Sequence, residues 1–429
     1  MLMIYDNEET KNFATEKENL IQEFTDKEHE ESSDQRNDIK RDAYRRDYAR
    51  VLYSSSFRRL QGKMQLLGIN PTNFHRNRLT HSLEVAQIAG SIARYLELKN
   101  PVVVETCSLA HDLGNPPFGH AGERVLNSLA NCIDYEGNAQ TFRILRHLEK
   151  KHFNYAGLNL TLRTLLGVTK YFYRKGENPR KPSKFLYEED YSFLDQKAKE
   201  MDFLDKKSID AQIMDLSDEI AYAAHDLEDA ISFGFMTVGE MIYEFKNSKE
   251  FKGASDIFND IAKKSQYFAS QANRMDTSEE YSFLLRKELT SQIVYELINN
   301  IEVVSEENVK QLGYTENYGK LAEGLKKLVF KALLRKKDVQ LYEKQGERII
   351  RGLFEVYIDP KFNDKFLLLP PEYRAIAEEE KSRDSEKEEV IKKRVVIDYI
   401  AGMMDSFAIQ EYQRYFGASS LEKIYEKNV

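Results

Sequence analysis

The first candidates for chemistry are two adjacent ionisable residues, His111 and Asp112, at the end of an apolar helical segment. Gly114 follows closely and favours the left-handed conformation that ends many helices, while the two prolines after it prevent the helix from continuing. A new helix is expected to begin near His120, with Glu123 one turn further along the same face. The spacing therefore predicts a His–Asp pair at one helix end and a His–Glu pair a short loop away.

A divalent metal ion needs more ligands than His111 and Asp112 provide. His81 lies inside a second apolar helix, and Asp218 lies inside a third. Burying these groups unpaired is costly, and a shared cation would offset that cost, although a histidine satisfied by its neighbours is the simpler alternative. Two imidazoles and two carboxylates suit Mn, Mg, Fe, Co, Ni or Zn without selecting among them. We therefore predict a site for one divalent metal ion.

Two further polar residues lie one helical turn from these ligands. Arg78 precedes His81 by three residues, and Tyr222 follows Asp218 by four. A guanidinium and a phenol beside a metal suit the non-bridging oxygens of a phosphate chain. A phosphate-binding loop of the P-loop type is excluded at 114–119, because a histidine stands where lysine is required and no strand precedes it.

The composition favours a helical protein. Among 429 residues there are only 20 glycines and nine prolines, below the usual share of about 12% for the pair, so the tight turns of an all-β fold cannot be supplied. Two cysteines are too few for a disulfide framework, and no secretory signal is visible, which favours a reducing, cytoplasmic compartment. There is no apolar run of about 18 residues, so we expect no membrane span. The net charge of −8 argues against a nucleic-acid-binding surface over the whole molecule.

Hydrophobic periodicity divides the chain into three expected regions. Residues 1–40 are polar and are expected to form a mobile or loosely docked arm, and residues 41–240 a helical core. Residues 241–429 should form a helical region that packs on the core and at subunit interfaces, with 303–429 helical throughout. Residues 174–205 interrupt the rhythm with two prolines and clustered aromatic residues, which indicates an irregular or hairpin insertion that could serve as a lid. We expect helices over 79–98, 102–113, 121–131, 139–152, 161–173, 209–232, 237–247, 254–273 and 279–302.

Several motifs together resemble the HD-domain deoxynucleoside triphosphate triphosphohydrolases, the bacterial dGTPase-like family. The resemblance implies an all-α fold with an HD-domain helical core and a helical C-terminal extension. One departure is Met64, where bacterial members commonly carry threonine, and it concerns the selectivity for the base. The matching segments occur in the family's order and are Ser56–Leu60 with Gln65, Asn77–Val85, His111–Glu123, Tyr135–Gln140, Leu158–Thr161 with Lys170, Asp215–Asp229 and Asp398–Asp405.

The resemblance implies a role for each matching position. The metal ligands would be His81, His111, Asp112 and Asp218. The catalytic histidine would be His120, supported by the carboxylate of Glu123. Contacts with the triphosphate would come from Arg78, Lys170 and Tyr222. Gln65 would lie near the sugar and base, and Asp226 would face the 3′-hydroxyl. Asn115 would lie on the substrate side of the loop that follows His111 and Asp112.

The family hydrolyses a dNTP to the deoxynucleoside and intact tripolyphosphate. The resemblance implies this activity on dGTP or on several dNTPs, with control of dNTP pools as its consequence. It also implies a homo-oligomer, a tetramer or a hexamer, and allows a dNTP activator at the subunit interfaces. His120 would either protonate the departing 5′-oxygen or take a proton from the attacking water. Two alternatives stay open: another HD-type phosphohydrolase acting on a monophosphate or a signalling nucleotide, and a non-catalytic protein that binds nucleotides or single-stranded nucleic acid.

Overall fold

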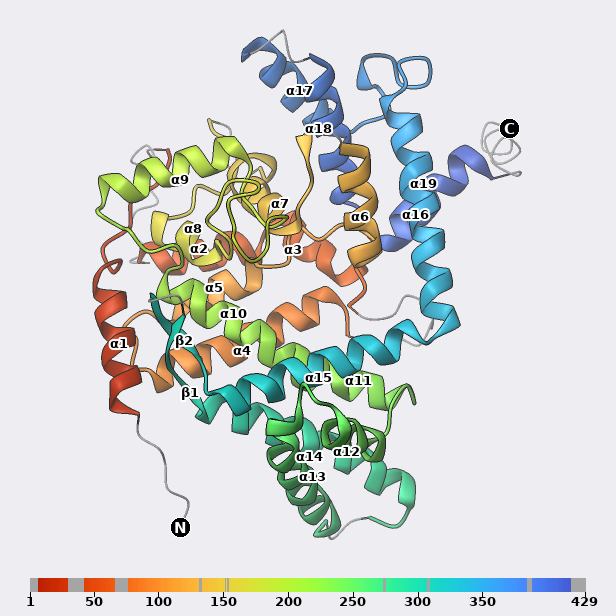
Figure 1. The fold of residues 1–429 in the computed structure, drawn as a ribbon. Helices are drawn as coiled ribbons and strands as arrows, with labels where there is room; N and C mark the ends of the chain where they lie inside the picture. Colours follow the sequence, from red (N-terminus) through yellow and green to blue (C-terminus); the bar gives the residue numbers. More distant parts are fainter. Residues whose placement is uncertain are drawn as a thin grey trace.

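Helices make up nearly all of the regular structure in the computed structural model, which describes residues 7–29, 42–65, 76–130, 133–150, 152, 154–272, 275–306, 309–383 and 388–417 (Figure 1). The expected all-α fold class is confirmed, with one small antiparallel hairpin added. In chain order the α-helices and strands are α1 Glu8–Asn19, α2 Ala43–Leu52, α3 Ser55–Arg59, α4 Arg78–Tyr95, α5 Pro101–Ala110, α6 Gly119–Ala130, α7 Gly137–Arg143, α8 Leu162–Val168, α9 Glu188–Glu200, α10 Ile209–Ala221, α11 Leu227–Ser232, α12 Val238–Asn247, α13 Ser255–Ser270, α14 Ser278–Asn299, β1 Ile301–Glu306, β2 Val309–Tyr314, α15 Glu316–Leu334, α16 Lys337–Ile358, α17 Pro371–Arg383, α18 Glu388–Ala401 and α19 Asp405–Phe416.

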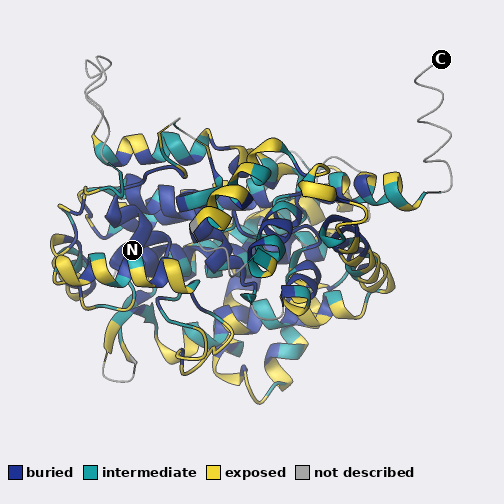
Figure 2. Ribbon diagram, turned by 90° about the horizontal axis from the view of Figure 1, so that it is seen from above, coloured by how far each residue is buried: buried dark blue, intermediate teal, exposed yellow. Residues whose placement is uncertain are grey.

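Helices α4, α5 and α10 pack against one another in the interior, where buried residues dominate (Figure 2). Helix α4 begins at a capping box, in which Asn77 accepts from the N–H of Thr80 and the Thr80 hydroxyl caps the N–H of Asn77. Helix α5 has Pro101 in its first turn, where the missing N–H costs nothing. Each of these helices carries one of the predicted metal ligands or ends directly before one.

The N-terminal segment 7–29 is packed firmly on this core, so the expectation of a loosely docked arm is wrong for these residues. Glu18 of α1 is fully buried and accepts hydrogen bonds from the N–H groups of Lys99 (2.8 Å) and Asn100 (3.1 Å), directly before α5. It also pairs with the buried Arg163 of α8, which binds Asp210 of α10 as well. Helix α1 therefore helps to fix three core helices. The rest of the expected arm, 1–6 and 30–40, lies outside the described residues.

The expected insertion at 174–205 contains no hairpin, and its irregular form is found only up to residue 187, because 188–200 form a helix. The chain runs without regular structure from 169 to 187 and then forms α9. The hairpin lies elsewhere: β1 and β2 pair antiparallel, with Val303 opposite Leu312, inside the region that we expected to be helical. Leu312 is buried there and its N–H binds Gln212 of α10, so a tertiary contact stabilises the strand.

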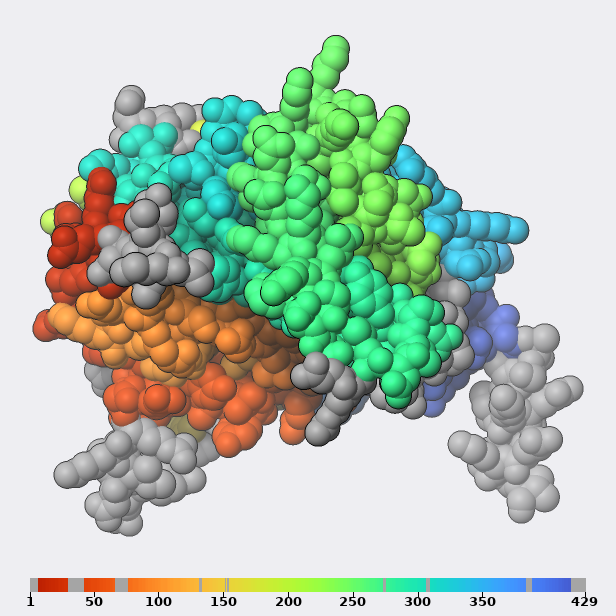
Figure 3. Space-filling view, turned by 90° about the horizontal axis from the view of Figure 1, so that it is seen from below, coloured from red at the N-terminus to blue at the C-terminus, as the bar shows by residue number. Residues whose placement is uncertain are grey.

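The buried apolar residues form two clusters, and the division does not fall at residue 240. The larger cluster combines the helices from α1 to α5 with α8 to α15. Helices α12 to α14 form a green lobe beside the orange surface that includes α4 in the space-filling view (Figure 3). The smaller cluster joins α6 to the C-terminal helices α16, α18 and α19, as Figure 1 also shows. Helix α6, which carries the predicted catalytic pair, is thus supported by the C-terminal end of the chain.

Candidate metal and catalytic site

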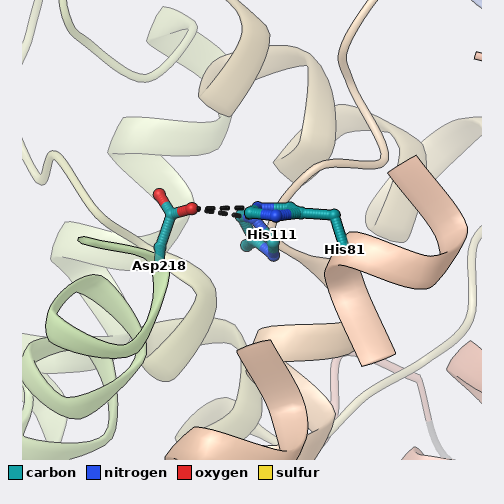
Figure 4. Close-up of side chains that lie close together, drawn as sticks. All are labelled: His81, His111 and Asp218. Carbon is teal, nitrogen blue, oxygen red and sulfur yellow. Dashed lines mark hydrogen bonds and ion pairs between the residues drawn. The ribbon is translucent and has the colours of Figure 1, made fainter. Parts of the chain in front are cut away.

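Three of the four predicted metal ligands meet in the interior (Figure 4). His81 projects from the first turn of α4, His111 follows the last residue of α5, and Asp218 lies on α10. Their ligand atoms all lie within 4.8 Å of one another. The distance from Asp218 Oδ1 to Nε2 is 3.2 Å for His81 and 3.6 Å for His111. In the part of the chain that the structure describes, this is the one group of such residues with metal-site spacing.

The surroundings of His111 fit a metal ligand. Its Nδ1–H donates to the carbonyl of Ser108 at 2.6 Å, which fixes the ring and turns Nε2 toward the cluster. That Nε2 is buried and has no hydrogen-bond partner. Burial by itself would lower the pKa of His111, but the carboxylates of Asp112 and Asp218 raise it to about 9. Two imidazoles and a carboxylate in a buried pocket are a suitable donor set for a divalent metal ion.

Asp112 borders the cluster but is held mainly by other partners. Its Oδ2 accepts from Nη1 of Arg78 at 2.5 Å, and its Oδ1 accepts from Nδ2 of Asn115 at 2.5 Å. The same Oδ1 lies 3.5 Å from Nε2 of His111. Despite its burial, His111 and Arg78 hold the pKa of Asp112 well below its usual range, so its charge is maintained. Asp112 therefore links the metal-type cluster to two predicted substrate residues.

Lys170 and Tyr222 lie on the side of the cluster formed by Asp218. Nζ of Lys170 is 3.0 Å from Asp218 Oδ2 and 2.6 Å from Asp215 Oδ1. The Tyr222 ring centroid is 5.3 Å from that of His81, and burial raises the pKa of the phenol, which stays protonated. Tyr222 begins a π-helical turn after α10, a local distortion that is common at functional sites.

The predicted catalytic pair occupies the start of α6. Nδ1 of His120 is 3.3 Å from Oε2 of Glu123, while 66% of the His120 side chain is exposed. Burial would raise the pKa of Glu123, but the hydrogen bond with His120 and the charge of Lys184 lower it to about 2. The ionised carboxylate can therefore orient the imidazole and leave Nε2 of His120 free to exchange a proton.

The turn before α6 is sharp and depends on residues from the other end of the chain. Phe118 and Gly119 both have positive φ, 63° and 57°, which costs little for glycine but is unfavourable for phenylalanine. Oδ1 of Asp405 accepts from the N–H of Phe118 at 3.0 Å. A Cβ added at Gly119 would lie 3.6 Å from Nη2 of Arg78, so this guanidinium reaches from Asp112 to the start of α6.

Gln65 lies against Asp226, which ends the π-helical turn that begins at Tyr222. Nε2 of Gln65 is 3.4 Å from Oδ2 of Asp226. Asp226 is fully buried, and burial raises the pKa of its carboxyl well above the usual range. Oε1 of Gln65 and Oδ1 of Asp226 are buried without a hydrogen-bond partner. Their unsatisfied oxygens are available to a polar ligand.

The sequence interpretation missed three residues that hold these groups in place. Lys63 donates to the carbonyls of Asn115 and Ala401, the latter at 2.8 Å, and burial lowers its pKa to about 7. Asp405 binds the turn before α6, and Lys184 binds Glu123. A signal was present for Asp405, which ends the last matching motif, whereas neither Lys63 nor Lys184 stands out from the many other lysines.

The residues of the candidate site from Arg78 to Tyr222 lie within a segment that matches a known domain family. The sequence matches the HD domain over residues 78–223 and a phosphohydrolase-associated domain over 312–414. It is 56% identical to deoxyguanosinetriphosphate triphosphohydrolase-like protein 2 of Vibrio cholerae serotype O1, over 99% of this chain and 100% of that protein. The chain belongs to this HD-domain family.

More distant relatives extend the match. The chain is 34% identical to the deoxyguanosinetriphosphate triphosphohydrolase-like protein of Shewanella sp. strain ANA-3, over 92% of this chain and 96% of that protein. It is 35% identical to the protein of the same name from Shewanella halifaxensis, over 89% of this chain and 93% of that protein. Family membership makes the protein an HD-type hydrolase. HD domains bind divalent metal ions, and the cluster of His81, His111 and Asp218 is a candidate site for one. Among the described residues, no helix combines the length and the apolar character needed to cross a membrane.

Proposed function

We propose that the protein hydrolyses dNTPs, dGTP or several of them, to deoxynucleoside and tripolyphosphate, and thereby controls dNTP pools. The observation that carries the proposal is the position of Arg78, which contacts Asp112 beside the metal-type cluster and reaches the start of α6 near His120. A phosphate group held by this guanidinium would lie between the cluster and the His–Glu pair.

The residues of the site can supply the steps of this reaction. Water attacks the α-phosphorus, the bond from phosphorus to the 5′-oxygen breaks, and the 5′-oxygen leaves with a proton as the deoxynucleoside. A divalent metal ion held by His81, His111 and Asp218, with Asp112 at its border, would polarise the phosphoryl oxygens when bound. Arg78 and Lys170 offset the charge of the triphosphate. His120, held at Nδ1 by Glu123, moves the proton at Nε2.

Gln65, Asn115, Tyr222 and Asp226 complete the proposed substrate contacts. The buried, unpaired oxygens of Gln65 and Asp226 suit hydroxyl or amino groups of the nucleoside. We further propose that the protein works as a homo-oligomer, a tetramer or hexamer, with a dNTP activator at its subunit interfaces.

Product analysis tests the proposed reaction. Each dNTP, alone and in pairs, is incubated with the protein and Mn²⁺ or Mg²⁺, and the phosphate products are separated by ion chromatography. We expect deoxynucleoside and tripolyphosphate in equal amounts. Release of orthophosphate or pyrophosphate alone would contradict the proposal and favour another phosphohydrolase activity. Nucleotide binding without turnover would favour a non-catalytic binder.

A matched variant separates binding from chemistry. His120→Ala removes the proposed proton-transfer group without touching the cluster of His81, His111 and Asp218. It should bind metal and nucleotide like the wild type while turnover falls by about 100-fold or more, the usual size of a general acid–base contribution. Wild-type turnover in His120→Ala would remove this residue from the mechanism.

A further inference from the structure

Lys184, in the irregular segment between α8 and α9, reaches the predicted catalytic pair from outside α6. Its Nζ lies 3.2 Å from Oε1 of Glu123 and 2.6 Å from Oε1 of Glu136. The lysine side chain is 28% exposed, whereas those of Glu123 and Glu136 are 17% and 2% exposed. One ammonium group is therefore shared by two carboxylates at the edge of the site.

The two carboxylates have different structural roles. Glu123 holds His120 with Oε2, and its Oε1 accepts from the N–H of Gly137 at 3.2 Å as well as from Lys184. Glu136 caps α7, where its Oε2 accepts from the N–H of Ala139 at 2.8 Å. Without a cation between them, these two carboxylates would repel each other in a poorly solvated place.

The segment that carries Lys184 is itself well anchored. The N–H of Lys184 donates to the carbonyl of Lys181 at 2.8 Å, and the N–H of Leu186 donates to that of Tyr173 at 2.9 Å. Leu186 is buried, and the hydroxyl of Tyr187 lies 3.1 Å from Oε1 of Gln140 on α7. The backbone around Lys184 is thus fixed on both sides, which reduces the entropy lost when the side chain binds Glu123.

We propose that Lys184 is a positioning residue for the His120–Glu123 pair: it holds the Glu123 carboxylate in the orientation that aligns His120. This inference rests on the proposed function for its effect on catalysis. Because both nearest partners of Nζ are carboxylates of α6 and of the α7 cap, the geometry favours this role over direct contact with substrate phosphate.

Kinetic variants test the role of Lys184. Lys184→Met removes the charge but keeps most of the side chain, Lys184→Arg keeps the charge, and Lys175→Met removes a charge from the same segment, where Lys175 pairs with Asp134. Because a charge-assisted hydrogen bond is lost, kcat of Lys184→Met should fall about 13- to 160-fold while KM changes less than about threefold. Lys184→Arg should recover most of this loss, and Lys175→Met should behave as the wild type.

A double-mutant cycle shows whether the lysine acts through Glu123. If it does, adding Lys184→Met to Glu123→Gln should lower kcat no further than Glu123→Gln alone, because the two residues act as one unit. Additive losses would overturn the proposal, as would wild-type kcat in Lys184→Met. A rise in KM without a change in kcat would instead show a direct phosphate contact and would also overturn it.

A readout that needs no activity separates this inference from the proposed function. In protein labelled with ¹³C-histidine, the ring signal of His120, assigned with His120→Ala, reports the orientation and hydrogen bonding of the imidazole at a fixed pH. Lys184→Met should move this signal, and Lys175→Met should not. An unmoved signal would refute the positioning role even if the wild type hydrolyses dNTPs. A moved signal would support that role even if the wild type hydrolyses none of them.

Discussion

Replacing Asp405 by asparagine probes how the C-terminal end of the chain supports the site. Oδ1 of Asp405 accepts from the N–H of Phe118, and Oδ2 accepts from the N–H of Met64 at 3.1 Å and from the hydroxyl of Tyr342 at 2.8 Å. Phe118 precedes the helix of His120 by one residue. The carboxylate is 5% exposed and thus joins three distant segments at one buried point.

The expected loss follows from counting donors. In Asp405→Asn one oxygen becomes an NH₂ group, which cannot accept from an N–H donor. At least one buried N–H group is then left unpaired, at a cost of about 1–3 kcal/mol. Where that cost falls on the turn at Phe118, the population of correctly placed His120 decreases about tenfold for each 1.4 kcal/mol. We expect kcat to fall about 5- to 140-fold with little change in KM.

The assay measures dNTP turnover with Mn²⁺ together with unfolding in urea. The control is Tyr342→Phe, which removes one of the three donors to Asp405 and leaves both N–H bonds in place. It should cost about 0.5–1.5 kcal/mol of stability and leave kcat nearly unchanged. Wild-type kcat in Asp405→Asn would refute the reasoning. So would an equal loss of kcat in both variants, because the turn before α6 would then not be what Asp405 controls.

Two other predictions concern charge in the interior. Asp112 and Asp218 overcome the effect of burial and raise the pKa of His111 to about 9, so this imidazole is protonated at pH 7 without metal. Binding of Mn²⁺ should therefore release about one proton. The affinity for Mn²⁺ should rise about tenfold per pH unit below pH 9. Calorimetry in Hepes and Tris buffers checks this, and equal heats in the two buffers would contradict it. Glu18→Gln removes one charged partner of the fully buried Arg163. The free energy of unfolding, measured in urea, should fall by about 3–5 kcal/mol. A decrease of less than about 1 kcal/mol would contradict a buried ion pair at this position.

Much of the fold could be predicted from local patterns. Helices α4 and α5 were expected within a few residues of their bounds, since apolar spacing acts locally, although α5 ends at Ala110 and Gly114 does not have the left-handed conformation that we expected. The single helix expected over 209–232 is α10, a π-helical turn at 222–226 and α11 in succession. The hairpin at 301–314 could not be predicted, because its stability depends on Leu312 contacting Gln212 of α10. The docking of α1 was missed for the same reason: Glu18 is a surface-type residue until Arg163 and the start of α5 surround it.

The candidate site shows the same limit. His81, His111, Asp218 and the pair of His120 with Glu123 could be selected by residue type and helical spacing, and their metal and catalytic roles stay predictions. Lys184, which holds Glu123, could not be selected, and the motif that ends at Asp405 did not indicate its contact with Phe118, since both partners lie far away along the chain.

The sequence by itself determined the helices, the break between α5 and α6, and the types of side chain available for chemistry, because periodicity, capping and chemical type are properties of short segments. Only the tertiary structure decided that three of the predicted ligands share one buried place, that Asp112 turns mainly toward Arg78, and that the C-terminal helices support α6. Those arrangements depend on packing between segments that are distant along the chain, and a pattern read along one segment holds no information about the partner it will meet.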